Sequence, residues 1–170
     1  MKRIMLVALC AFFVLSNTAM AQSRVNSFDS VDFAVPADKV WNYLRDFDSL
    51  PKWHPAFSGD MIISGENNVV GVVRTLTIKD GPSFDEELLT MDNEARSFSY
   101  RVIDPNPLPL EEYVSTFKVI STGDKSSAVI WSSSYTNKAD SKMKDADLIK
   151  FINGVYHAGL ENAKALLQRK

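Results

Sequence analysis

The central part of the chain alternates apolar and polar residues with a period of two, which is typical of strands that bury one face. A first run of this kind lies at residues 25–35. Turn signals such as Asp80-Gly81-Pro82 divide the stretch from Phe57 to Tyr135 into six further runs. Because the gaps between runs are short, we expect antiparallel hairpins, with strands near residues 58–64, 69–79, 84–92, 96–103, 111–121 and 126–136.

A three- to four-residue spacing of apolar residues predicts helices in two other places. Pro36 fits a first helical turn, and apolar residues follow at helical spacing as far as Phe47. Ser49 can cap a second short helix that ends near Trp53. The C-terminal segment predicts one long amphipathic helix, with acids near its start and bases near its end. Its apolar residues are Leu148, Phe151, Ile152, Val155, Gly159, Ala163 and Leu166.

This order of elements predicts an α+β fold: one strand, two short helices, six strands and a long helix. A seven-stranded antiparallel sheet with one apolar face needs a cover, and the terminal helix is the only element long enough. We therefore expect a strongly curved sheet wrapped on that helix. Side chains do not always fill such a space, so the geometry favours a cavity that binds an apolar ligand.

The first 21 residues differ from the rest. Two basic residues precede an apolar run from Ile4 to Leu15, and Ala19-Met20-Ala21 supplies small residues where a signal peptidase cuts. We predict a signal peptide at residues 1–21 and a single domain at residues 22–170, located in the periplasm. No later segment reaches about 18 apolar residues, so we expect no membrane span after cleavage.

Charge and composition narrow the function classes. The chain has 19 basic and 21 acidic residues, and loss of the signal would remove Lys2 and Arg3. The resulting acidic surplus disfavours nucleic acid as a partner. The single cysteine, Cys10, lies in the predicted signal, which leaves no disulfide or thiol nucleophile. Two histidines without a carboxylate cluster make a weak metal site, and no P-loop, nucleophile elbow or dinucleotide fingerprint occurs. We therefore predict no metal or cofactor and assign no catalytic residue.

Motifs spread along the chain carry a family resemblance: "VPADKVWNYLRDFDSLPKWHP", "GVVRTL", "DEELLTMDNEARSFSYRV", "AVIWSSSY" and "NGVYHAGLENAKAL". Together they resemble the START/Bet v 1 superfamily, also called SRPBCC or polyketide cyclase/dehydrase-like. The resemblance implies a helix-grip fold with a deep cavity between the sheet and the terminal helix. Within the superfamily the chain is similar to the MxaD type of periplasmic methanol-oxidation accessory protein, which implies a dehydrogenase or cytochrome as partner.

The family's Gly-x-x-Arg arginine faces the cavity, which places Arg74 inward. Glu86 stands at the position of the family's inward acid. An arginine among apolar neighbours needs an acid or a ligand anion, so we predict a buried Arg74–Glu86 pair. The alternative is that both are ordinary charges on the open face of the sheet.

Four aromatic residues share the inward face of the later strands if the alternation holds. Each offers apolar area and one hydrogen-bonding group, which suits a mostly apolar ligand with a few polar atoms. The alternative is that they only fill the core. These residues are Tyr100, Tyr113, Trp131 and Tyr135.

Two other segments supply candidates for ligand contact. Phe151, Val155 and Gly159 match cavity-facing positions of the family's last helix, where core packing is the alternative. The resemblance also brings His54 to the cavity mouth, where an imidazole could bond a ligand or act as a base. A partly exposed histidine fixed by Pro55 is the alternative.

Three functions follow from these candidates. The first is a periplasmic protein that binds a small apolar molecule in the cavity. The second is an accessory protein that contacts its dehydrogenase or cytochrome through a surface such as residues 53–57 and the proline-rich loop at 104–113. The third is a cyclase or dehydratase whose acid and base would come from His54, Glu86 and Tyr113.

Overall fold

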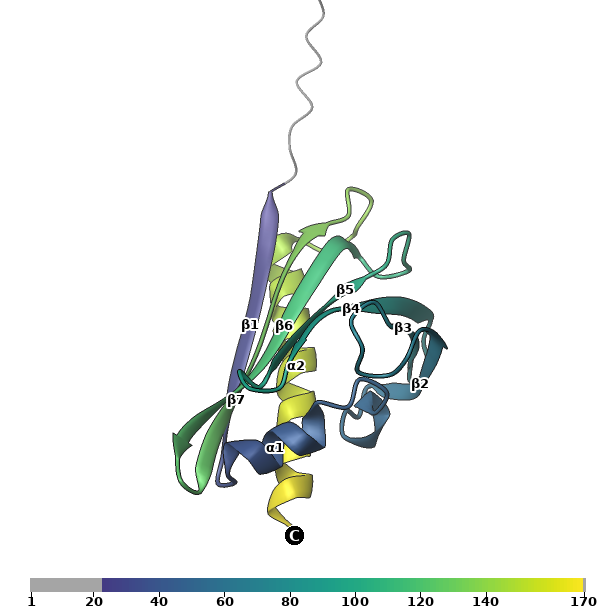
Figure 1. The fold of residues 1–170 in the computed structure, drawn as a ribbon. Helices are drawn as coiled ribbons and strands as arrows, with labels where there is room; N and C mark the ends of the chain where they lie inside the picture. Colours follow the sequence, from purple (N-terminus) through teal and green to yellow (C-terminus); the bar gives the residue numbers. More distant parts are fainter. Residues whose placement is uncertain (1–22, 170) are drawn as a thin grey trace, which may run out of the picture.

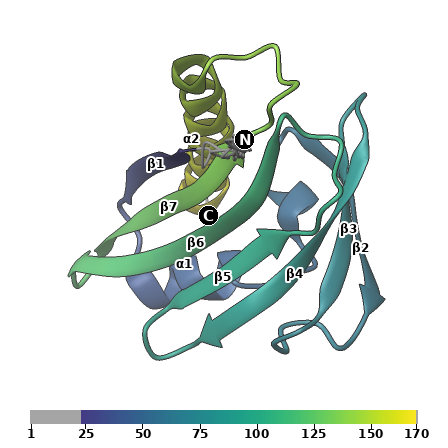
Figure 2. The same ribbon diagram turned by 90° about the horizontal axis from the view of Figure 1, so that it is seen from above.

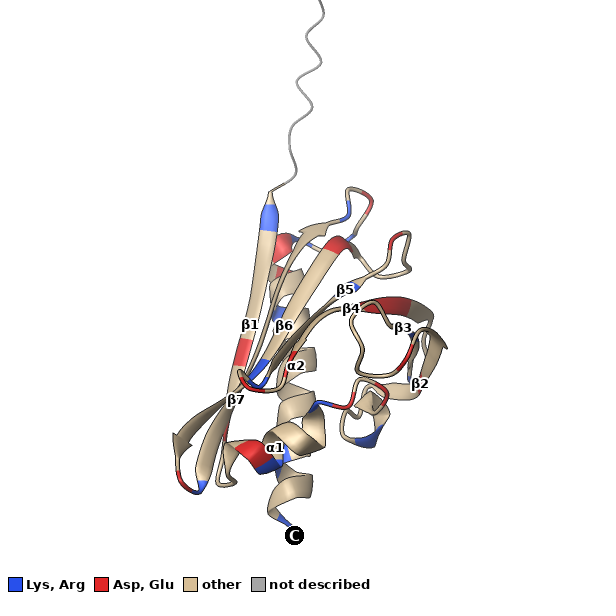
Figure 3. Cartoon of the chain, viewed as in Figure 1, with Lys and Arg blue, Asp and Glu red and all other residues tan. Residues whose placement is uncertain are grey.

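A computed structural model describes residues 23–169 of the chain (Figure 1). The predicted signal peptide, residues 1–21, lies outside the described residues. Across this range no helix combines the length and the hydropathy that a membrane crossing requires. Figure 3 shows acidic and basic residues interspersed over the visible strands and loops.

The described residues form the predicted α+β fold, a seven-stranded antiparallel sheet packed on a long C-terminal helix. The strand order is β1-β7-β6-β5-β4-β3-β2. Figure 2 shows the sheet curving, with α2 beside β1 and β7 at one end and β2 at the other. The strands are β1 (Arg24–Phe33), β2 (Phe57–Ser64), β3 (Val73–Ile78), β4 (Ser83–Asp92), β5 (Ser97–Val102), β6 (Leu110–Gly123) and β7 (Ser126–Asn137).

Two short helices follow the first strand, as predicted: α1 (Ala37–Leu44) and the single-turn 3-10 helix η1 (Leu50–Lys52). Pro36 precedes the first helical residue, where its fixed φ suits helix entry. Ser49 occupies the N-cap position of η1, but its hydroxyl donates to the Asp46 carbonyl at 2.7 Å instead of capping. Together α1 and η1 close the lower side of the sheet's concave face (Figure 1).

The long helix α2 spans Asp145–Gln168, and two acids in its first turn suit the helix dipole. It contacts β1 far more than any other strand. At that edge Asn153 Oδ1 accepts the Phe28 backbone N–H at 2.9 Å, and His157 Nδ1 lies 3.2 Å from Asp29 Oδ2. One edge of the sheet is thus covered by the helix.

The opposite edge of the sheet is β2, which within residues 23–169 packs against the single-turn η1 and not along a long helix. Its inward residues are Asp60 and Ile62, and its outward residues Met61 and Ile63 are 61% and 49% exposed. The pairing of β2 with β3 shifts register twice, between Phe57 and Gly59 and between Ile62 and Ser64. The two edges therefore differ in cover, in apolar exposure and in regularity.

Strand β3 is shorter than the predicted run at residues 69–79. Val69, Val70 and Gly71 form a turn before it, with Gly71 at a φ of +90° that favours glycine. Val70 is therefore 58% exposed, although it is two positions from the buried Val72 and would share its face in a continuous strand. Strand alternation predicts faces only while the chain remains a strand.

Candidate functional site

A buried ionic cluster lies where β2, β3 and β4 meet. Arg74 and Glu86 stand directly opposite each other in the β3–β4 ladder. Arg74 donates from Nε and Nη2 to Glu86 Oε2 at 3.0 and 2.7 Å, and from Nη1 to Asp60 Oδ2 at 3.1 Å. Nη1 also donates to the Phe47 carbonyl, and the guanidinium lies 3.8 Å from the centre of the Phe47 ring. The predicted buried Arg74–Glu86 pair is confirmed.

This cluster holds two carboxyl groups against one guanidinium. Burial raises the pKa of both Asp60 and Glu86, and the charge of Arg74 offsets only part of that effect. The second oxygen of Asp60, Oδ1, has no hydrogen-bond partner within the described residues. Sequence reasoning missed Asp60. The available signal was that Asp60 and Ile62 are two positions apart on β2 and so share a face. The register of β2 that brings Asp60 to Arg74 cannot be read from the sequence.

An uncharged network of aromatic and hydroxyl groups occupies the other half of the interior. Tyr113 and Tyr156 share a hydrogen bond between their hydroxyls at 2.5 Å, and Tyr156 donates to Ser133 Oγ at 2.7 Å. The Tyr156 ring stacks on Trp131, with centroids 4.5 Å apart and planes 12° from parallel. Tyr156 comes from α2, so this network joins the helix to β6 and β7.

Trp131 extends the same network toward β5. Its indole N–H lies 3.0 Å from both Tyr100 Oη and Ser115 Oγ. Tyr135 bonds separately with Ser27 at 2.6 Å. Burial raises the pKa of Tyr100, Tyr113, Tyr135 and Tyr156, so these hydroxyls stay neutral. The four predicted aromatics, Tyr100, Tyr113, Trp131 and Tyr135, all face inward.

His54 lies inside the protein and fastens the segment before β2 to α2. Its Nδ1 accepts the Ala56 N–H at 3.2 Å, which leaves Nε2 as the donor to the Val155 carbonyl at 3.0 Å. Burial lowers the pKa of His54 to about 4, against a smaller opposite effect from the Val155 bond. The alternative considered from sequence, that His54 is partly exposed, is therefore wrong, since only 1% of its surface is exposed.

Gly159 allows the His54 ring to lie this close to α2. A Cβ at position 159 would lie 2.2 Å from His54 Cδ2, well inside contact distance. The group that lies against Gly159 is thus a side chain of the protein itself. By contrast, a Cβ at Gly154 on the same helix would meet nothing within 4 Å.

The neighbouring residue, Trp53, is also buried, with 3% of its surface exposed. Its ring packs between His54, Phe117 and Trp131, and its carbonyl accepts from Asn162 Nδ2 of α2 at 2.9 Å. The expectation that residues 53–57 offer a surface to a partner is wrong for Trp53 and His54. Both side chains belong to the interior.

The prediction for the last helix is only partly right. Gly159 is buried, but Phe151 is 52% exposed and Val155 is partly exposed, so Phe151 does not face the interior. The buried stripe is rotated around the helix and includes Tyr156, which sequence reasoning left out. It consists of Leu148, Ile152, Tyr156, Gly159, Leu160, Ala163 and Leu167.

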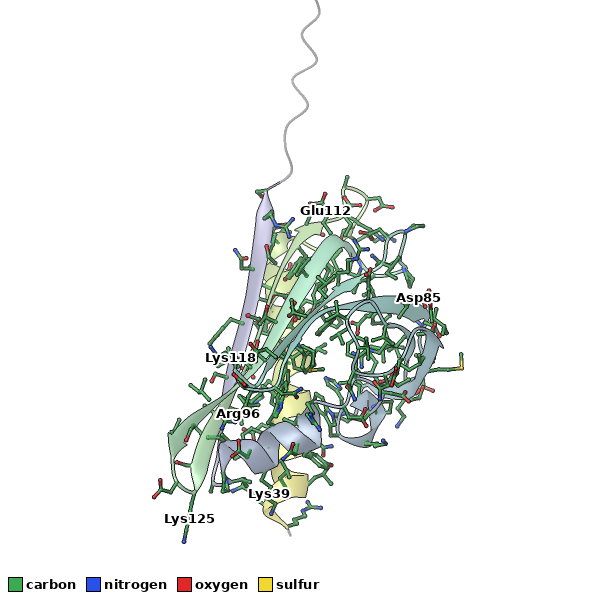
Figure 4. The ribbon with its side chains drawn as sticks, viewed as in Figure 1. Lys39, Asp85, Arg96, Glu112, Lys118 and Lys125 are labelled. Atoms are coloured by element: carbon green, nitrogen blue, oxygen red, sulfur yellow. The ribbon has the colours of Figure 1, made fainter. Side chains whose placement is uncertain are left out.

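Between these groups remains a cavity of about 10 Å³. Figure 4 shows side chains crowding the space between the sheet and α2, whereas the labelled Asp85, Glu112 and Lys125 lie at the periphery. A volume of this size holds about one water molecule, whereas ligand pockets of small molecules begin near 300 Å³. The deep cavity implied by the resemblance is filled here by the protein's own rings. The cavity is lined by Phe47, Trp53, Phe98, Tyr100, Phe117 and Trp131, with Leu44, Leu50, Asp46 and Arg74.

The residues considered for acid–base catalysis have separate partners. His54 bonds to Val155 and Ala56, Glu86 to Arg74, and Tyr113 to Tyr156. Within residues 23–169 no three His, Asp or Glu side chains gather closely enough to hold a metal ion.

The curved sheet wrapped on α2, with this aromatic interior, defines a protein of the helix-grip class. The family model for polyketide cyclase / dehydrase and lipid transport matches residues 25–168. The chain therefore belongs to that family.

Solved structures agree with this assignment. An uncharacterised protein from Bacillus thuringiensis is 27% identical with a TM-score of 0.75, and the match covers 85% of this chain and 99% of that one. The protein XoxI from Bacillus cereus is 26% identical with a TM-score of 0.76, covering 85% and 96%. A norcoclaurine synthase point mutant from Thalictrum flavum shares the fold at 22% identity, with a TM-score of 0.67 and coverage of 88% and 98%.

Proposed function

We propose that this protein is an exported binding protein that takes a small, mostly apolar molecule between its sheet and α2. The observation that carries the proposal is the buried cavity lined by six aromatic rings and Arg74, which lies where the fold can admit a ligand. Aromatic walls supply apolar contact, and the hydroxyl and indole groups supply a few polar ones. The family's description, which includes lipid transport, supports the same class of ligand.

In this proposal the packed interior is a closed state that a ligand opens. The boundary that gives way is the contact between residues 53–56 and α2. Two hydrogen bonds hold it, His54 to Val155 and Asn162 to Trp53. Breaking two such bonds costs about 1–3 kcal/mol, which binding of a small apolar ligand can offset. Displacing Trp53 and His54 would open the cavity toward solvent.

The direct test is native mass spectrometry of the protein purified from its own periplasm. A retained ligand would appear as a fixed mass excess that disappears on denaturation. A bare mass, together with no rise in melting temperature from any member of a small-molecule library, would contradict the binding function.

The closed state can be tested by a substitution at Gly159. Gly159→Ala places a methyl group where the His54 ring lies and forces that ring away. We expect a loss of about 1–3 kcal/mol in unfolding free energy and stronger binding of a hydrophobic dye. Gly154→Ala is the matched control, and should instead stabilise the helix by about 0.5–1 kcal/mol. Equal behaviour of the two variants would argue against a boundary at this point.

The periplasmic location is part of the proposal and rests on residues 1–21. Fusing these residues to a reporter that is active only after export should give activity in the periplasm. Replacing the apolar run at residues 4–15 with polar residues should abolish it. Full activity without that run would refute the export signal.

An accessory role of the MxaD type is the second candidate, and exposed apolar residues favour it. Met61, Ile63, Val69 and Val70 lie on β2 and the loop after it, and each is about half exposed or more. A methanol-type dehydrogenase or its cytochrome would bind there. Met61→Lys with Ile63→Lys should weaken that complex, whereas Val114→Lys on β6 should not. Equal binding by both variants would exclude this surface.

A further inference from the structure

One buried side-chain nitrogen in the described residues has no hydrogen-bond partner. Four buried side-chain polar atoms have no hydrogen-bond partner there; three are oxygens, of Asp60, Asn67 and Asn137, and the fourth is Trp53 Nε1. The chain's other two indoles are both bonded, Trp41 to Asn93 at 3.3 Å and Trp131 to Tyr100 and Ser115. An unpaired buried donor is unfavourable, so Trp53 gains most from a group that accepts its proton.

Trp53 also lines the central cavity, and it is 97% buried. Arg74 and Trp131 also line the cavity, and each of their donor nitrogens has a protein partner. Each nitrogen of the Arg74 guanidinium donates to a protein oxygen, and the Trp131 N–H points to two hydroxyls. Among the side-chain donor atoms of the residues that line the cavity, the indole nitrogen of Trp53 is the one that has no hydrogen bond at all within the described residues.

The charges near the cavity select the kind of acceptor. Asp60 and Glu86 both contact Arg74, so two carboxyl groups lie against one guanidinium beside the cavity. A ligand carboxylate would meet this acidic surplus, and Arg74 already has two carboxylate partners. An ammonium group would share the cavity with the guanidinium and could not accept from Trp53. A neutral oxygen avoids both conflicts.

The geometry points to Trp53 as the residue that determines ligand specificity, through an indole N–H that donates to a neutral acceptor oxygen. The ligand class is then an uncharged molecule with an apolar body and one carbonyl, ether or hydroxyl oxygen. This inference rests on the proposed binding function and refines it, because it excludes both fatty-acid-like anions and pure hydrocarbons as preferred ligands.

The test uses the ¹⁵N-labelled protein and three matched probes: cyclohexanone, methylcyclohexane and cyclohexanecarboxylate. The spectrum contains three indole N–H signals, from Trp41, Trp53 and Trp131. We expect cyclohexanone to move the Trp53 signal downfield and leave Trp41 unchanged. Its Kd should be about tenfold lower than that of either other probe, which is the contribution of one hydrogen bond. Trp53→Phe should remove this preference, and Trp41→Phe should keep it.

Each other outcome overturns the inference. Binding of cyclohexanone without a shift of the Trp53 signal would mean another group recognises the oxygen, or that the indole bonds to a trapped water only. Tighter binding of cyclohexanecarboxylate would assign recognition to Arg74. If none of the three probes binds, this inference fails, whereas the proposed function is decided by the native mass and the library screen. The wild-type spectra need no substitution, so the test stands even if Trp53→Phe does not fold.

Discussion

The interior of this protein contains two buried polar regions, and their buried polar groups find partners in different ways. Between β2, β3 and β4, a single guanidinium is surrounded by two carboxyl groups and a carbonyl. Between β5, β6, β7 and α2, neutral hydroxyl and indole groups bond to one another. Each region is closed to solvent, but only the first holds formal charge.

The difference lies in what each region loses when one member is removed. Removing a neutral hydroxyl leaves a partner that lacks one hydrogen bond, which costs about 1–3 kcal/mol of unfolding free energy. Removing a buried cation leaves unpaired buried carboxyl groups, which costs more unfolding free energy. The ionic region should therefore be fixed, and the neutral region adaptable, so that a ligand could rearrange the second without disturbing the first.

The largest predicted effect is at Arg74. Arg74→Met should lower the free energy of unfolding by about 3–5 kcal/mol, because Asp60 and Glu86 stay buried without a cation. Urea denaturation measures it. The loss should be smaller at pH 5 than at pH 8, since protonated carboxyl groups need no cation.

Arg101 on β5, two strands away from β3, provides the matched control. It bonds to Glu87 at 2.6 Å, but its side chain is 53% exposed. Arg101→Met should cost less than about 1 kcal/mol. Similar losses in the two variants would remove the distinction between a buried and an exposed pair.

The next effect concerns His54, which fastens the segment before β2 to α2. Its pKa is lowered to about 4 in the folded protein, so the unfolded chain takes up the proton first as the pH falls. Stability from His54 is complete above about pH 6.5 and is lost as the pH falls toward 4, by roughly 3 kcal/mol in total.

Unfolding free energies of wild type and His54→Gln, measured from pH 7 to 4, test this. The variant should lose less stability over that range. His157→Gln should follow the wild type, because the His157 side chain is 62% exposed. A parallel pH dependence in all three proteins would show that His54 is not the titrating group.

The smallest effect is expected in the neutral region. Tyr156→Phe removes the bonds to Tyr113 and Ser133 and should cost about 1–2 kcal/mol. Tyr113→Phe breaks the same Tyr113–Tyr156 bond, so the double variant should cost less than the sum of the single ones. Strict additivity in thermal or urea unfolding would mean that the two hydroxyls do not interact.

The sequence predicted strand faces better than helix faces, for a physical reason. A strand has two faces, so one correct assignment places every other residue; Tyr113 and Trp131 follow from this, whereas the family resemblance placed Arg74 inward. A helix can present any angle around its axis. The stripe chosen from Phe151 and Val155 was rotated from the true one and omitted Tyr156.

Whether the interior is open or filled could not be predicted from the sequence. The composition of the cavity wall follows from alternation, but the space left over depends on how Trp53 and His54 pack against α2. That packing is set by contacts between residues about a hundred positions apart, such as His54 with Val155. The same holds for Asp60, whose contact with Arg74 requires the register of β2 against β3.

The irregular pairing of β2 also bears on solubility. Exposed strand edges invite other chains to add a strand, and proteins resist this with bulges that twist the edge away. The open edge here, with outward Met61 and Ile63, is the one whose ladder slips register twice. Such an edge is a poor template for fibril growth despite its apolar side chains. A partner at this edge would therefore recognise the side chains of β2 and not its backbone.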